Sequence, residues 1–189
     1  MNLDPITRAA TIVAILALVG LSACSKKSAP PTVEILLTDL VQTNGRLFKI
    51  GDSNYFTGVM IEKFPDGQLK SRSSVSNGVL WGLSEGWHTN GQLQVRETFL
   101  DGKSEGLRSK WDFNGVKISE ATIVGGKLNG LFRRWHTNGI LADEVVMTND
   151  QPNGLARAWY PSGAPKAEIQ LANGDILHQK RWDDESRRP

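Results

Sequence analysis

The sequence predicts an all-β fold, an elongated antiparallel meander of consecutive β-hairpins from five 24-residue repeats. Three observations lead to this fold class: glycines at a fixed spacing, a tryptophan at one position of four units, and turn dipeptides between short runs. Such internal periodicity identifies a repeat array. The first glycines of the units are Gly58, Gly82, Gly106, Gly130 and Gly154, and the second are Gly67, Gly91, Gly115, Gly139 and Gly163.

The composition is that of an ordinary globular chain. It has 189 residues, 22% of them charged and 39% hydrophobic, with a net charge of +2. Basic and acidic residues are interspersed and no phosphate-tracking basic stripe occurs, so we expect no nucleic-acid partner. Cys24 is the only cysteine, which excludes an internal disulfide.

The chain begins with an apolar run from Ala9 to Ala23 that ends in Leu21-Ser22-Ala23-Cys24. The run is shorter than the roughly 17 to 25 residues that span a bilayer, which disfavours a permanent transmembrane helix. The segment resembles a bacterial lipoprotein signal peptide, and this resemblance implies cleavage after residues 1–23 and lipidation of Cys24. Acyl chains on Cys24 would then anchor the protein to a membrane.

Residues 24–32 contain a Pro-Pro pair and almost no apolar side chains, so we expect an extended tether. Ser25 follows the cysteine where lipoproteins kept at the inner membrane carry aspartate. The resemblance therefore implies a cell-envelope location, at the outer membrane and facing the periplasm. Residues 33–57 follow as N-terminal capping strands, with hairpin chemistry at Asn44-Gly45.

Each repeat unit in the range 58–177 predicts two strands. Counted from its first glycine, position 10 is always glycine, and positions 20 and 21 carry a turn pair such as Asn77-Gly78. Runs of about eight residues therefore alternate with turn signals, as in consecutive β-hairpins. Helices are disfavoured, because glycine recurs too often and the apolar spacing does not follow a 3.6-residue period.

The loop near position 10 sets which residues share a face, because a one-residue slip turns a whole strand over. A two-residue turn would place position 6 opposite position 13, and a three-residue loop would place it opposite position 12. The longer loop puts glycine last, where a type I turn with a G1 bulge needs a left-handed residue. We therefore expect the three-residue loop, with positions 2, 6, 12, 16 and 18 on one mostly apolar face.

No single unit buries enough apolar surface to fold alone, so neighbouring units must stack. His178 stands where a sixth glycine is due, which ends the array. Residues 178–189 are expected to form a C-terminal cap and a charged tail.

The pattern Gly-Leu-x-x-x-Trp-x-x-Asn-Gly followed by Asp/Asn-Gly resembles the MORN-repeat variant of bacterial YwqK-type antitoxin-like proteins. The likeness extends over about Leu47 to Gly174, and Tyr55-Phe56-Thr57-Gly58 also resembles that family. It implies a repeat scaffold and suggests an antitoxin role. Lys63 and Asp150 depart from the pattern, at an aromatic and a glycine position.

The sequence offers little catalytic or metal-binding chemistry. His88 and His136 occupy equivalent positions two units apart, too far to share a metal ion, which needs three or four converging ligands. No Ser-His-Asp order, carboxylate pair or phosphate-binding loop stands out from the repeat. We therefore expect no enzyme activity, no metal and no cofactor.

The tryptophan row is the candidate binding feature, and it has two interpretations. The rings either pack between units as core or form an exposed strip that docks a partner. Core packing is the expectation at the inner two positions and partial exposure with binding at the outer two. The row consists of Trp87, Trp111, Trp135 and Trp159.

Together these features favour a membrane-anchored, protein-binding or scaffolding module at the cell envelope. The alternative, carried by the family resemblance, is an antitoxin or immunity protein that binds and neutralises a toxin. The sequence does not identify the partner or the oligomeric state.

Overall fold

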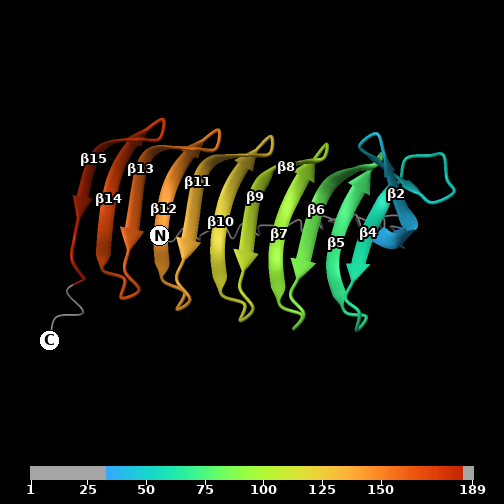
Figure 1. Cartoon of the computed structure of the whole chain (residues 1–189), viewed down its shortest axis with the longest axis horizontal. Coiled ribbons are helices and arrows are strands. Elements are labelled where there is room, and N and C mark those ends of the chain that lie inside the picture. Colours follow the sequence, from blue (N-terminus) through green and yellow to red (C-terminus); the bar gives the residue numbers. More distant parts are fainter. Residues whose placement is uncertain (1–32, 185–189) are drawn as a thin grey trace, which may run out of the picture. The chain divides into compact units, whose positions relative to one another are not determined.

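The computed structural model describes residues 33–184. The expected signal peptide, Cys24 and the tether lie outside this range, as do residues 185–189. The described part is almost entirely β-strand, with one short 3₁₀ turn, which confirms the all-β meander of hairpins. The strands of the array follow one another in chain order across one long sheet (Figure 1).

The array begins at Gly58 and its last strand ends at Arg181, so this strand crosses the expected boundary between residues 177 and 178. The strands are β4 (Gly58–Lys63), β5 (Leu69–Ser76), β6 (Val79–Trp87), β7 (Leu93–Leu100), β8 (Lys103–Ser104), β9 (Gly106–Trp111), β10 (Lys117–Val124), β11 (Lys127–Trp135), β12 (Leu141–Thr148), β13 (Gln151–Trp159), β14 (Pro165–Ala172) and β15 (Asp175–Arg181).

The segment before the array contributes a strand and a hairpin. β1 (Glu34–Leu36) pairs with β4 in parallel, which no sequence pattern indicated. After the 3₁₀ turn η1 (Leu37–Asp39), β2 (Leu40–Thr43) and β3 (Arg46–Lys49) form the hairpin expected around Asn44-Gly45.

Two-residue turns connect each unit to the next. Both turn residues have positive φ, 49° at Asn77 and 77° at Gly78. Two positive φ angles define the type I′ turn, whose twist matches that of the flanking strands. Asn149 and Asp150, with φ of 49° and 69°, adopt the same turn without glycine.

Three-residue loops connect the two strands within each unit. In the second unit the N–H of Gly91 donates to the carbonyl of His88 at 2.9 Å, and the N–H of His88 donates to the carbonyl of Gln92 at 2.8 Å. Gly91 has φ of 81°, the left-handed value that the G1 bulge requires. Trp87 accordingly pairs with Leu93, so position 6 lies opposite position 12 as predicted.

A β-bulge follows this pair and changes the rest of the register. Gly86 pairs with Val95 while Trp87 pairs with Leu93, which leaves Gln94 as an extra residue on β7. The same shift occurs in every unit, at position 13. The prediction that positions 16 and 18 share a face with positions 2, 6 and 12 is therefore wrong, because the extra residue turns them to the opposite face.

The sheet has two faces that this register defines. We call the side of positions 3, 5, 14, 16 and 18 the hairpin face, because Met60 and Leu80 line a hollow there with Leu47 of β3. We call the side of positions 2, 4, 15 and 17 the open face. The most deeply buried apolar side chains of the array lie mainly on the hairpin face: Val75, Ala121, Ile123, Met147 and Ala167.

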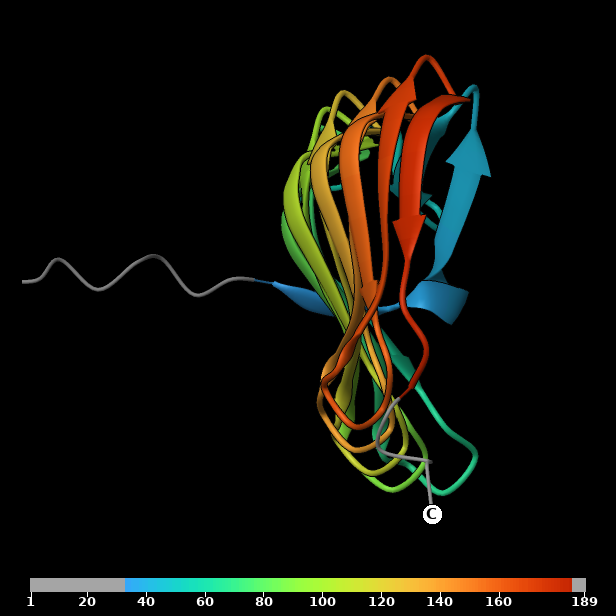
Figure 2. The ribbon, with the colours of Figure 1, turned by 90° about the vertical axis from the view of Figure 1, so that its left-hand side faces the viewer.

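The first glycines of the second, fourth and fifth units lie inside β6, β11 and β13, where the pairing with the preceding strand is irregular. Between Ser73 and Val75 on β5, the facing strand β6 passes through additional residues around Gly82, whose φ is 93°. A Cβ on the equivalent Gly130 would approach Thr122 to 2.9 Å. Glycine is thus required here both by φ and by close approach. Figure 2 shows the strands curving along their length.

Candidate binding surface

The open face carries an exposed row of large apolar side chains. Leu83, Leu107 and Leu131, all at position 2, are 44%, 54% and 38% exposed. They lie opposite Thr98, Thr122 and Val146 on the next strands. Further exposed apolar side chains flank them on the same strands and their neighbours: Trp81, Leu100 and Val124. We call these six residues the apolar row.

Large exposed apolar side chains that gather on one face are typical of interaction sites in soluble proteins. The strands of the apolar row follow each other in the sheet from β6 to β11, and at Val59, beside β1, the same repeat position is only 5% exposed. Within the repeat array, the apolar row is therefore left uncovered and is available to a partner.

A ladder of ion pairs crosses strands β10 to β14 on the open face and overlaps the apolar row at β10 and β11. Arg133 lies between Glu120 and Glu144, with N–O distances of 3.9 and 3.2 Å. Arg157 continues the ladder between Glu144 and Glu168, at 3.4 Å from each. Partly exposed pairs of this kind contribute little stability singly, about 0 to 1 kcal/mol. Their effect here is to neutralise the charges across the middle of the open face.

The tryptophan row predicted from the sequence lies at the loop end of the strands. All four tryptophans are partly buried, and the expected difference between the inner and outer positions stays a prediction. The ammonium of Lys117 lies 5.8 Å from the ring centre of Trp111 and 5.5 Å from that of Trp135. These cation–π contacts cover part of the inner two rings and link adjacent units.

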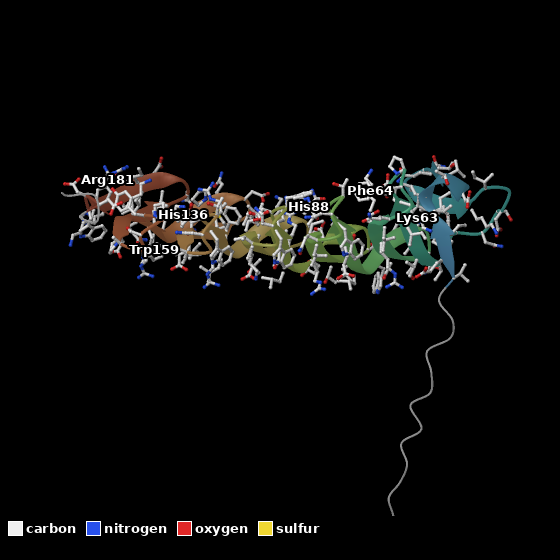
Figure 3. All side chains as sticks on the ribbon, turned by 90° about the horizontal axis from the view of Figure 1, so that it is seen from below. Lys63, Phe64, His88, His136, Trp159 and Arg181 are labelled. Atoms are coloured by element: carbon white, nitrogen blue, oxygen red, sulfur yellow. The ribbon has the colours of Figure 1, made fainter. Side chains whose placement is uncertain are left out.

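The histidines join neighbouring loops. Nε2 of His88 lies 3.0 Å from the carbonyl oxygen of Trp111, and Nε2 of His136 lies 2.9 Å from that of Trp159. A carbonyl oxygen can only accept a hydrogen bond, so Nε2 donates in both. Each of these hydrogen bonds connects one unit to the next. Seen from the loop end, the two histidines occupy separate loops along the array (Figure 3). Within residues 33–184 no group of three metal-ligating side chains converges.

Sequence reasoning missed the exposed leucines as surface residues. Position 2 is apolar in every unit, which is the usual signal of a core column, and only the bulge places it on the open face.

The helices of residues 33–184 include none long and apolar enough to cross a membrane.

No protein-family model and no curated protein matches the sequence. Among solved structures, the crystal structure of TarM is 11% identical over 51% of this chain and 19% of its own length, with a TM-score of 0.34. A point mutant of S. aureus TarM, in complex with Fondaparinux, alpha-GlcNAc-glycerol and UDP, is 12% identical. That match covers 62% of this chain and 21% of the other, with a TM-score of 0.33. The chain spans about a fifth of these proteins, and likeness at this level carries no functional argument.

Proposed function

We propose that the chain is a non-enzymatic, protein-binding repeat module held at the cell envelope by a lipid anchor on Cys24. The observation that carries the proposal is the apolar row, in which Leu83 and Leu107 are about half exposed on neighbouring units of one sheet face. Exposed apolar surface rimmed by polar residues is typical of protein interaction sites. Ion pairs on the strands of the row supply polar neighbours of this kind, Arg96–Glu85 on β6 and β7 and Arg133–Glu120 on β10 and β11.

The repeat architecture supports this function physically. Hydrogen-bonded strands and stacked loops hold the leucines in a fixed row, so a partner meets a surface that costs little entropy to order. The tryptophan row at the loop end adds half-buried aromatic side chains. Tryptophan is among the residue types most enriched at binding hot spots. The anchor rests on the residues around Cys24, which lie outside the described range.

Site-specific photo-cross-linking in cells that produce the full chain tests the proposal. A photoreactive phenylalanine analogue at Leu107 should give an adduct with one defined protein. The matched control is Gln179, which is exposed on β15 and pairs with Ile169 on the hairpin face. No adduct from Leu107, or the same adduct in equal yield from Gln179, would contradict protein binding through the open face.

The identity of the adduct also decides between the two forms of the proposal. A scaffolding role predicts an envelope protein of the same cell. A secreted toxin in the adduct would instead make this chain an antitoxin or immunity protein, which the family resemblance suggests.

A further inference from the structure

A hollow of about 640 Å³ opens on the hairpin face, where the second unit meets the third. Its volume lies within the roughly 300 to 1,000 Å³ usual for ligand sites. The walls come from β7 and β9, from the bulge residue Ile118, and from His88 and Phe113 at the two neighbouring loops. Val95 and Trp111 complete its apolar lining.

The charged groups in the hollow are satisfied, with one exception. Glu97 accepts a hydrogen bond from Ser104 at 2.8 Å and lies 3.7 Å from Arg108. Asp112 accepts two backbone N–H bonds of its own loop at 2.9 Å. Among residues 33–184, no ion-pair or hydrogen-bond partner is found for the ammonium of Lys110. Within the described part of the chain, the hollow therefore presents one free positive charge beside an apolar wall.

The third unit departs from its sister units at the positions that shape this hollow. At position 8 it carries Phe113, 52% exposed, where the other units have threonine or proline. At position 13 it carries Ile118, the only apolar side chain larger than alanine in that column. In a repeat array the shared residues account for the fold, so departures that converge on one place need another explanation.

The junction of the fourth and fifth units offers a comparison. A hollow of about 340 Å³ lies there, also on the hairpin face. At its wall Ala158 replaces Lys110, and Lys166 replaces Ile118. The fold thus provides a hollow at both junctions, and of these two the one between the second and third units is larger and carries Phe113 and Lys110.

We propose that this hollow binds a segment of the partner protein in which an apolar side chain stands beside a carboxylate. The inference rests on the proposed protein-binding function and adds the chemistry of the recognised segment. The apolar side chain packs against Phe113, Trp111 and Ile118, and the carboxylate pairs with Lys110. A basic segment is disfavoured by repulsion from the ammonium of Lys110, while Glu97 and Asp112 are already engaged by Ser104, Arg108 and loop N–H groups.

Blocked five-residue peptides test the inference on the full chain. The first probe has a phenylalanine between two glutamates. The second replaces the glutamates with lysines, and the third replaces the phenylalanine with alanine. Amide NMR shifts locate and quantify binding. We expect the first peptide to shift the resonances of Lys110, Phe113 and Gln94, and the other two to bind at least fivefold more weakly.

Two variants use residues that sister units already carry, so folding should be retained. Lys110→Ala should weaken the first peptide about two- to fivefold, the range for a partly exposed ion pair. Phe113→Thr should weaken it at least about fivefold, as expected for an aromatic anchor. Arg134→Ala is the matched charge control. Arg134 holds position 5 in the next unit, where it donates to Asp143 and does not line the hollow. Arg134→Ala should therefore bind the first peptide with unchanged affinity.

Equal binding of the glutamate and lysine peptides would overturn the inference, as would full affinity in Phe113→Thr. Tighter binding of a hexathymidylate strand at the same resonances would also overturn it, in favour of a nucleic-acid ligand. If the peptides miss the hollow while Leu107 still cross-links to a protein, only the hollow fails. If the first peptide binds there but Leu107 gives no adduct, the open face fails and the hollow stands.

Discussion

Replacing one buried and one exposed aliphatic residue of the same unit tests the register imposed by the bulge. Ile123, at position 18, is 1% exposed on the hairpin face, whereas Leu107, at position 2, is 54% exposed on the open face. Their substitution by alanine removes the same number of side-chain carbons. Ile123→Ala should lower the free energy of unfolding by about 2 to 5 kcal/mol, the sum of lost burial and a cavity. Leu107→Ala should change it by no more than about 0.5 kcal/mol.

Chemical denaturation of both variants and the wild type measures this difference. Repeat arrays can lose two-state behaviour, so the midpoints should be followed by both circular dichroism and tryptophan fluorescence. Similar losses in the two variants would refute the register, because they would mean that positions 2 and 18 are equally buried.

Three further predictions concern strain, stacking and the anchor. Gly130→Ala should lower the free energy of unfolding more than Gly139→Ala, measured by chemical denaturation. Both glycines have positive φ, but only at Gly130 would a Cβ come within 2.9 Å of a neighbouring side chain. Equal losses of unfolding free energy would contradict this. Deleting residues 106–129 removes one whole unit and should leave a cooperatively unfolding protein, whereas deleting 106–117 joins mismatched strands and should not; equal thermal melting of the two deletions would refute stacking by whole units. Cys24→Ala should leave an unlipidated, uncleaved precursor in mass spectra of the intact protein, and wild-type protein of that same form would refute the anchor.

The period, the turns and the loop length were predictable because they depend on local chemistry. Positive φ at residues such as Asn77 and Gly91 restricts the residue types, and glycine or asparagine reports it in the sequence. The bulge was not predictable. Its extra residue is Gln94 in one unit and Ile118 in the next, so position 13 shows no common side chain that could signal it.

The apolar row could not be predicted because the bulge could not. Without the bulge, the apolar pattern at position 2 indicates that Leu107 is a core residue. Its exposure follows only from the observed strand pairing. The parallel strand Glu34–Leu36 was unpredictable for a related reason, since its three residues pair with β4 by long-range contact alone. The tryptophans were found as a row from spacing, but their degree of burial depends on contacts such as Lys117, which stands where other units carry leucine or proline.

The most direct test of protein binding by the open face is the affinity of a triple variant for the cross-linked partner. Leu83→Glu, Leu107→Glu and Leu131→Glu together place charges along the apolar row, at side chains already 38% to 54% exposed. The circular dichroism spectrum and the unfolding midpoint should stay close to those of the wild type, while the affinity for the partner falls at least tenfold. An unchanged affinity in the folded variant would contradict the account.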